Sequence, residues 1–343
     1  MAFLGGEVGL FKSLVRNWRV KILIQKLVSF IPGNAGFQTN EYLTRLFRGE
    51  YRFNPKRRFI LGLTNLQRIC SLDRSFLLVN KNVVELGTGW HGVDLILFYL
   101  LGANRIVTID HHSHLKLPYI IKHIKSIREE EVYSLLVEAG MLVDRLTHLE
   151  KLVNSVSTLE ELLNGMGVEY IIVSSQNYNK LQLEDIDFFY SESVLQRIPT
   201  THLEELFCNV SAAMREGGMV FNRTDQKDVN ALSHADSELW PLHYLKYSDF
   251  FFNNVLSCRF NSQNRLRESE FVKIFIEQGL QPLFVESYIL ESDIERLKSL
   301  KLATRFCSMS LDDVAIRSSL IICKKTNDRD NVTCKRIIRK ESF

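Results

Sequence analysis

The sequence predicts an α/β protein with a doubly wound, mostly parallel sheet of seven strands. Short apolar runs alternate with helical segments from about residue 82, which is typical of β-α-β units. A glycine-rich turn follows the first of these runs. The 343 residues suffice for one large domain with additions. The predicted strands are 81–87, 105–110, 169–174, 186–191, 218–222, 280–290 and 318–324.

Composition and charge are those of an ordinary globular protein. Hydrophobic residues make up 45% and charged residues 24% of the chain, which excludes global disorder. The 43 Lys and Arg against 40 Asp and Glu are too balanced for a dedicated nucleic-acid binder. The six cysteines form no CxxC pair, and no uncharged apolar stretch reaches the roughly 18 residues of a membrane span. We expect a cytoplasmic protein with free thiols and no nucleic-acid partner.

Three parts follow one another along the chain. Residues 1–75 form a basic, helical N-terminal extension, and 76–326 form the sheet domain. Two long insertions, at about 111–164 and 223–267, follow predicted strands, and such insertions usually cover or shape a substrate site. Residues 327–343 are a charged tail that we expect to be mobile.

The N-terminal extension alternates basic and apolar side chains from Phe11 to Phe30, before Pro32 and Gly33 stop the helix. One interpretation is an amphipathic helix on an anionic membrane surface, which would place the protein at the inner face of the membrane. The other is a helix that packs its apolar side on the protein's own domain. The second is favoured, because the apolar residues are spread too widely for one clean stripe.

The segment that carries the chemistry surrounds the glycine-rich turn. Gly87, Gly89 and Gly92 satisfy the pattern GxGxxG after a strand and before a helix, and Asp110 ends the next strand. Taken alone, this is the fingerprint of dinucleotide binding. An NAD-dependent oxidoreductase is therefore one interpretation of the sequence.

Glu85 argues against a dinucleotide. It comes two residues before Gly87, where its carboxylate can point into the cofactor cleft and would repel a pyrophosphate. S-adenosylmethionine carries no phosphate, and a carboxylate attracts both its sulfonium and its ammonium. Asp110 discriminates less, because its two oxygens can accept from the ribose hydroxyls of either cofactor.

These residues resemble the first motif of class I S-adenosylmethionine-dependent methyltransferases, an acidic residue, one spacer and then GxGxG. Glu85, Gly87, Thr88 and Gly89 match it, and Asp110 matches the acidic residue after the family's second strand. The resemblance implies a Rossmann-like fold with an antiparallel last strand. It also implies S-adenosylmethionine as the cofactor and these residues as its ligands.

Other segments of the chain extend the resemblance. Residues 186–199 look like the family's fourth-strand motif, and 214–220 look like its turn into the fifth strand. The family places an acidic or amide side chain against adenine at the end of the third strand. The resemblance therefore implies Gln176 or Asn177 as the adenine contact.

A narrower resemblance concerns the acceptor. Four segments look like methyltransferases found with bacterial polysaccharide and cell-envelope biosynthesis, although the usual Asp-His pair of that group stands here as Asp228 and Val229. The resemblance implies a small-molecule or glycan acceptor. The segments are ELGTGWHG, NRTDQKDVNALSHAD, HYLKYSDF and NRLRESEF.

An alcohol acceptor must lose a proton, so a general base is expected past the fourth and fifth strands. The candidates are Glu192, Asp228 and His234, with Asp225 or Asp236 also able to orient the histidine. A histidine is the most suitable of these, because it titrates near neutral pH. A non-catalytic binding module on the same fold stays open as an alternative.

Two further groups of residues each have two interpretations. His111, His112 and His114 either converge on a metal ion or, as we favour, form a polar loop beside the ribose, so we predict no metal site. A second group past the fifth strand forms either a wall for the acceptor or the core of a small cap. Its members are Tyr247, Phe250, Phe251, Phe252, Asn264, Arg265 and Arg267.

Overall fold

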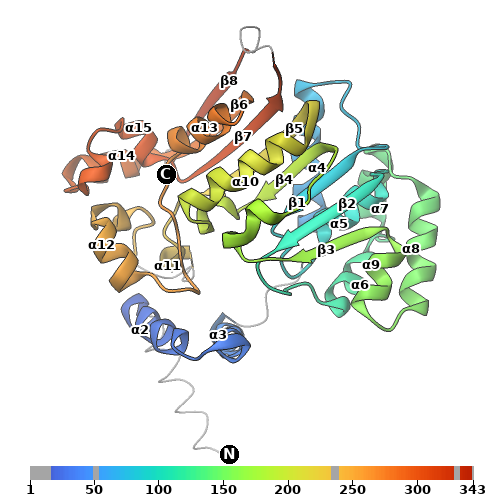
Figure 1. Cartoon of the computed structure of the whole chain (residues 1–343), viewed down its shortest axis with the longest axis horizontal. Helices are drawn as coiled ribbons and strands as arrows, with labels where there is room; N and C mark the ends of the chain where they lie inside the picture. The colour runs from blue at the N-terminus through green and yellow to red at the C-terminus, as the bar shows by residue number, and fades with distance from the viewer. Residues whose placement is uncertain (1–16, 49–53, 233–238, 328–332, 342–343) are drawn as a thin grey trace, which may run out of the picture.

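The structure, a computed structural model, describes the whole chain apart from residues 1–16, 49–53, 233–238, 328–332 and 342–343. Its centre is a sheet with the strand order β3-β2-β1-β4-β5-β7-β6-β8 (Figure 1). Neighbouring strands run parallel except at β7, which is antiparallel to β5 and β6. The strands are β1 (Asn82–Leu86), β2 (Arg105–Asp110), β3 (Val168–Ile172), β4 (Ile186–Glu192), β5 (Met214–Asp225), β6 (Leu280–Leu290), β7 (Ser318–Lys325) and β8 (Lys335–Glu341).

Helices cover both faces of the sheet (Figure 1), which confirms the doubly wound α/β class. Residues of α4 and α5 share one core with the sheet, and residues of α10 and α13 share a second core on the other face. The longer helices are α2 (Trp18–Ser29), α3 (Gly33–Arg48), α4 (Pro55–Leu72), α5 (Val93–Leu100), α6 (Leu117–Ser126), α7 (Glu130–Glu138), α8 (Val143–Ser155), α9 (Leu159–Gly165), α10 (Thr200–Ala213), α13 (Glu268–Glu277) and α14 (Glu291–Ser299). The short ones are η1 (Ser175–Lys180), η2 (Leu195–Arg197), α11 (Val229–Leu232), η3 (His243–Lys246), α12 (Asp249–Phe251), η4 (Phe252–Leu256), η5 (Thr304–Phe306) and α15 (Leu311–Ala315).

All seven predicted strands form, and β2 and β6 have the predicted bounds. The largest departure is β5, which is much longer than the predicted 218–222. It pairs with β4 from Met214 onward and with β7 as far as Asp225. Hydrogen bonds to β4 on one side and to β7 on the other thus keep these residues in a strand, although they lack the apolar pattern of one.

The predicted strand count of seven is wrong by one, because part of the predicted charged tail forms β8. This strand adds in parallel to β6 at the edge of the sheet. Arg336 lies 3.4 Å from Glu268, and Arg339 pairs with Glu286. The charges that suggested a mobile tail are therefore matched by acidic partners, as is common on edge strands.

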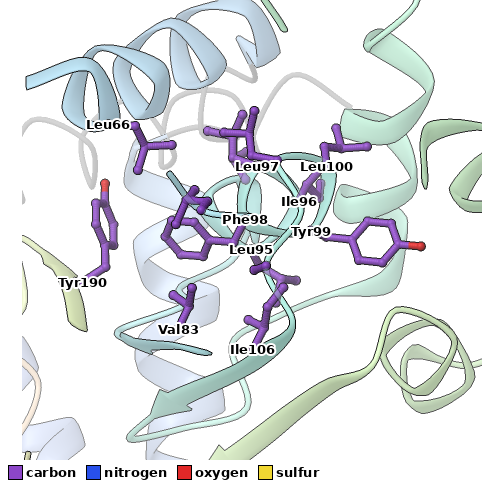
Figure 2. Packing of buried hydrophobic residues seen from close by; sticks show 14 of the residues in the cluster. Leu66, Val83, Leu95, Ile96, Leu97, Phe98, Tyr99, Leu100, Ile106 and Tyr190 are labelled. Carbon is purple, nitrogen blue, oxygen red and sulfur yellow. The ribbon is translucent and has the colours of Figure 1, made fainter. Parts of the chain in front are cut away.

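The helix α4 belongs to the sheet domain rather than to a separate extension. Leu66 of α4 packs beside Val83 and Ile106 of the sheet around α5 (Figure 2). The two helices approach closely at Gly62, where a Cβ would lie 2.3 Å from Cδ1 of Leu97. The predicted boundary between the extension and the sheet domain is therefore too late in the chain, and α4 reaches the edge where ligands bind such sheets.

The two predicted insertions have different roles. The first contains α6 to α9, whose buried residues extend the core around α4 and α5. The second joins α2, α14 and α15 in a third core, here called the cap, which contains Ile22, Leu245, Phe252, Phe306 and Val314. Only the second insertion thus builds a separate unit. None of the described helices combines the length and apolar composition needed to cross a bilayer.

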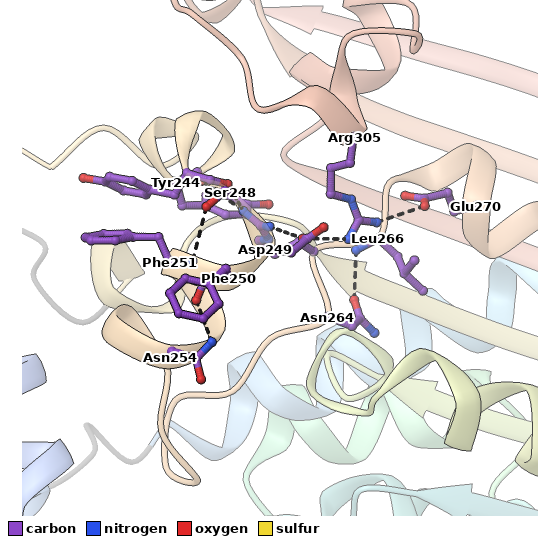
Figure 3. Close-up of polar contacts among 12 residues, drawn as sticks. Tyr244, Ser248, Asp249, Phe250, Phe251, Asn254, Asn264, Leu266, Glu270 and Arg305 are labelled. Atoms are coloured by element: carbon purple, nitrogen blue, oxygen red, sulfur yellow. Dashed lines mark hydrogen bonds and ion pairs between the residues drawn. The ribbon is translucent and has the colours of Figure 1, made fainter.

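Arg265 and Arg267 hold the cap together instead of forming an acceptor wall. The Arg267 side chain is fully buried and donates to the carbonyls of Gln226 and Val314 at 3.2 and 3.1 Å. Arg265 donates to the carbonyl of Tyr247 at 2.7 Å, beside the contacts drawn in Figure 3. Both guanidinium groups donate to backbone carbonyls of the chain itself, so neither is free to bind an acceptor at the carboxyl ends of the strands.

Candidate functional site

A cavity of about 570 Å³ lies at the carboxyl ends of β1, β2 and β4. It is lined by the turn 87–93 after β1, by residues 110–114 after β2 and by 192–197 after β4. One side of α4 closes it, with Arg58 and Gly62 on the lining. The strand order reverses between β1 and β4, and ligands of open α/β sheets bind at such a switch point.

The glycine turn is shaped for close approach. Gly87 has φ +92°, and a Cβ there would lie 2.1 Å from Cγ2 of Val194. Gly89 has φ +65° and faces open space, so its backbone is bare toward the cavity. Its N–H donates to Oδ2 of Asp110 at 3.0 Å. The turn is thus pinned to β2 and leaves room for a ligand against its backbone.

Asp110 does more than the sequence predicts. Its Oδ1 accepts from the N–H of His111 at 2.7 Å, while Oδ2 accepts from Gly89. The carboxylate therefore fixes the glycine turn and also lines the cavity. Each oxygen has further acceptor capacity, so a sugar hydroxyl can still bind there.

Glu85 is a buried carboxyl on the cavity lining. Thr108 donates to its Oε2 at 2.6 Å, and Thr88 bonds in turn to the Thr108 hydroxyl. Burial, and then the nearby charge of Asp94, raise the pKa of Glu85 to about 8. No Lys or Arg in the described part of the chain forms an ion pair with Glu85. The cavity therefore holds a carboxyl that a bound cation would ionise.

Beside Glu85, Tyr190 and Glu192 line the cavity and accept hydrogen bonds from Asn65, a buried residue behind the lining. Asn65 of α4 donates to the Tyr190 hydroxyl at 2.9 Å and to Glu192 Oε2 at 2.6 Å. Asn65 in turn accepts from Arg223 at 2.8 Å. Burial, and then the charge of Glu192, raise the pKa of Asp94 to about 7. Residues of β4, β5 and α4 thus form one hydrogen-bonded network at the wall.

The electrostatics of the cavity favour a cation. Glu85, Asp94, Asp110 and Glu192 all line the same small volume. Two arginines also line it, the exposed Arg58, whose charge acts on Asp94, and the half-buried Arg197, so the carboxyl groups outnumber the arginines by four to two. A pyrophosphate would meet four acidic groups, two of them desolvated, whereas a sulfonium or ammonium would be attracted by them.

The cavity brings together most of the predicted cofactor residues, but not all of them. Gln176 is exposed in η1, and neither it nor Asn177 lines the cavity. His234 lies outside the described residues, as does Asp236. The predicted residues on the lining are Glu85, Gly87, Thr88, Gly89, Asp110 and Glu192.

Asp228 lies in the buried interior of the cap and not on the cavity lining. It pairs with His243, whose Nδ1 lies 3.3 Å from Oδ2 of Asp228 and 3.0 Å from the Trp240 carbonyl. Burial raises the pKa of Asp228 to about 6 and lowers the pKa of His243 to about 4. An aspartate paired with a histidine was expected, but the histidine is His243.

The three histidines after β2 stay together, with the His112 ring centroid 4.2 Å from that of His111 and 5.7 Å from that of His114. His111 and His114 line the cavity, with His114 stacked on Trp90 at 5.3 Å between ring centroids. His112 instead packs on Phe37 of α3 at 3.8 Å. Among the described residues, no group of three or more His, Cys, Asp or Glu is arranged to hold a metal ion.

Several residues of the site were missed from the sequence, among them Asp94, Tyr190 and Arg58 on the lining and Asn65 behind it. Asp94 and Tyr190 had usable signals, because Asp94 opens the helix after the glycine turn and Tyr190 shares a strand face with Glu192. Arg58 and Asn65 had none, since α4 precedes every recognisable motif. Only the packing of α4 on α5 brings them to the cavity.

The fold and the site define a doubly wound α/β domain with an acidic ligand cavity at its switch point. No family model matches the chain, and no curated protein matches it. Solved structures do match. An S-adenosylmethionine-dependent methyltransferase from Mesorhizobium loti is 14% identical with a TM-score of 0.38, over 76% of this chain and 99% of that one.

A second match is phosphoethanolamine N-methyltransferase 2 of Haemonchus contortus in complex with phosphomonomethylethanolamine and S-adenosylhomocysteine. It is 14% identical with a TM-score of 0.40, over 77% of this chain and 52% of that one. Because these identities and TM-scores are low, the fold class is taken from the strand order of this chain itself.

The contact between the glycine turn and Val194 gives a prediction about stability. Gly87→Ala should lower the free energy of unfolding by about 1–2 kcal/mol for its positive φ and by a further 1–3 kcal/mol or so for overpacking. Gly140→Ala is the matched control, because its φ is +89° with nothing within 4 Å of a Cβ. Denaturant unfolding measures both.

The double variant Gly87→Ala with Val194→Ala should recover most of the overpacking cost. If Gly87→Ala costs no more than Gly140→Ala, the loop after β4 does not close on the turn as described.

Proposed function

We propose that the protein is an S-adenosylmethionine-dependent methyltransferase. The observation that carries this is the pair of desolvated carboxyls, Glu85 and Asp94, on the lining of a cavity at the switch point. S-adenosylmethionine supplies a methyl group on a positively charged sulfur. Glu85 and Asp94 meet the positive charges of the cofactor, and Asp110 accepts from its ribose hydroxyls.

The glycine turn completes the proposed cofactor site. Gly87 and Gly89 let the cofactor lie against the backbone, and Thr88 holds the Thr108 hydroxyl that serves Glu85. Gln176 and Asn177 stay the proposed adenine contacts on the resemblance alone. Ordering these groups before the cofactor arrives contributes to affinity, because little needs to reorganise.

The proposed acceptor is a small molecule or a glycan intermediate of the cell envelope, methylated on oxygen. The support is the resemblance of the four segments to methyltransferases of polysaccharide and cell-envelope biosynthesis. Methyl transfer needs the acceptor oxygen held in line with the sulfonium, and positioning alone contributes much of the rate. The loop 192–197 lines the cavity and contacts the second insertion, because Arg197 donates to the carbonyl of Ser262 at 3.3 Å and Asn264 donates to that of Leu195 at 2.8 Å.

Three residues are proposed as the base that takes the acceptor's proton. Glu192 is supported by its place on the cavity lining and by Asn65, which orients its carboxylate. Asp228 acts through its histidine partner in the cap, and His234 is supported by its titration near neutral pH. Glu192 is our first choice, because a base must reach the acceptor directly.

The alternatives make different demands on the cavity. An NAD-dependent oxidoreductase would place a pyrophosphate in the same cavity, where the charges of Asp110 and Glu192 oppose it and Glu85 and Asp94 would have to stay protonated. A non-catalytic module would bind the same cofactor and transfer nothing. Binding and transfer therefore have to be measured separately.

We expect S-adenosylmethionine and S-adenosylhomocysteine to bind and NADH not to bind. Isothermal titration of the full chain with each of the three ligands measures this. Asp110→Asn should weaken S-adenosylhomocysteine binding by about tenfold or more, the loss of one charge-assisted hydrogen bond. Tight NADH binding with no response to S-adenosylhomocysteine would establish the oxidoreductase alternative instead.

Glu192→Gln should leave S-adenosylhomocysteine affinity nearly unchanged and reduce methyl transfer by a factor of about 100 to 10,000. Transfer is measured as labelled methyl incorporated from S-adenosylmethionine into a glycan extract. His234→Ala and Asp228→Asn are assayed in parallel. If either of them abolishes transfer while Glu192→Gln keeps it, the base comes from the segment that follows β5. Binding without transfer by the parent protein would indicate the non-catalytic module.

A further inference from the structure

Helix α2 carries apolar side chains on two opposite sides. One side packs into the cap, where Trp18 and Ile22 join its core. The other side presents Leu23, Leu27 and Phe30, with 58%, 61% and 77% of their surface exposed. A helix that only packs on its own domain would not need this second apolar side. The exposed row is therefore a feature to be explained.

A second exposed apolar row belongs to the cap, far from α2 in sequence. Phe250, Phe251 and Val255 of α12 and η4 have 77%, 40% and 43% of their surface exposed. Figure 3 shows Phe250 and Phe251 on the opposite side of α12 from Glu270. These rings were predicted as an acceptor wall or cap core, and the structure turns them to the outside instead.

The two rows lie side by side. Lys26 of α2 donates from Nζ to the carbonyl of Val255 at 3.2 Å and also contacts the carbonyl of Asn254. Figure 1 shows α2 and α12 next to each other at one end of the molecule. We call the six side chains of the two rows the apolar face; they are Leu23, Leu27, Phe30, Phe250, Phe251 and Val255.

Basic side chains lie beside the apolar face. Arg19, Lys246 and Arg259 are exposed on the same helices and the loops next to them, and the half-buried Lys26 contacts η4. Lys21 instead acts by its charge on the buried Asp228 of the cap. The acidic residue that opens α12, Asp249, is engaged by Arg265 and Arg305 of the cap. The surroundings therefore carry a positive charge that complements an anionic surface.

From this geometry we propose that the apolar face binds the surface of an anionic lipid bilayer. Exposed large apolar side chains beside exposed Lys and Arg are the combination that binds in the interfacial region of such bilayers. The apolar side chains enter the headgroup boundary, and the basic ones contact the lipid phosphates. The proposal does not depend on methyl transfer.

The charge also decides against a second copy of the chain as the occupant. A two-fold dimer through this face would bring these basic side chains close to those of the other copy, because such interfaces are self-complementary. The preceding residues 1–16 add Lys12 and Arg16 against Glu7, so they increase the positive charge. A bilayer of anionic lipids is the partner that this charge favours.

Vesicle cosedimentation of the full chain tests the proposal. The parent protein should bind vesicles of equal parts phosphatidylglycerol and phosphatidylcholine at least about tenfold more tightly than phosphatidylcholine alone, and binding should weaken with salt. The double variant Leu27→Glu with Phe250→Glu should lose at least about tenfold in affinity for the anionic vesicles. Thermal melting checks that the variant is folded.

The double variant Leu77→Glu with Val137→Glu is the matched control, because the two side chains are 62% and 47% exposed and lie before β1 and in α7, outside the apolar face. It adds the same two negative charges and should bind as the parent does. No binding of the full chain to the anionic vesicles would overturn the proposal, as would equal loss in the control. Parent dimers that Leu27→Glu dissociates in sedimentation velocity would show a protein interface instead and also overturn it.

Discussion

A buried carboxyl group, Glu85, and a half-buried one, Asp94, set the terms for the site, and neither forms an ion pair with a described residue. Burial raises the pKa of both Glu85 and Asp94, and protonation spares the free protein the cost of two desolvated charges. The sheet places Glu85 at the end of β1, and α5 carries Asp94 opposite it. A cavity built in this way selects ligands by their charge, whatever their shape.

The surrounding structure holds these groups in place. Asp110 pins the glycine turn, Thr108 bonds to Glu85, and Asn65 joins β4 to α4. The close contact at Gly62 brings α4 near enough for that last bond. The fold and the site thus depend on the same contacts, because α4 both closes the cavity and forms part of the main core. The cap has a core of its own, in which two buried arginines donate hydrogen bonds to backbone carbonyls.

Local features could be predicted from the sequence because their causes are local. Glu85, Gly87 and Asp110 follow from a strand, a turn and the next strand, so their meeting at one edge is dictated by parallel pairing. The contribution of Asn65 could not be predicted, since it depends on how α4 packs on α5. The eighth strand was missed for a similar reason: acidic partners far away in the sequence neutralise its charges. His243 escaped notice because only the folded cap brings it to Asp228.

The cavity is suited to bind a cation, and the number of protons released on binding tests this most directly. Glu85 has a pKa of about 8 in the free protein, so it is mostly protonated at pH 7. A bound sulfonium or ammonium favours its carboxylate, so binding should release a proton and strengthen as the pH rises toward 8. Calorimetry of S-adenosylmethionine binding at pH 7 in two buffers of different ionisation enthalpy counts that proton. The parent should release more protons than Glu85→Gln, which keeps an acceptor for Thr108. Equal proton release by the two proteins would contradict the account.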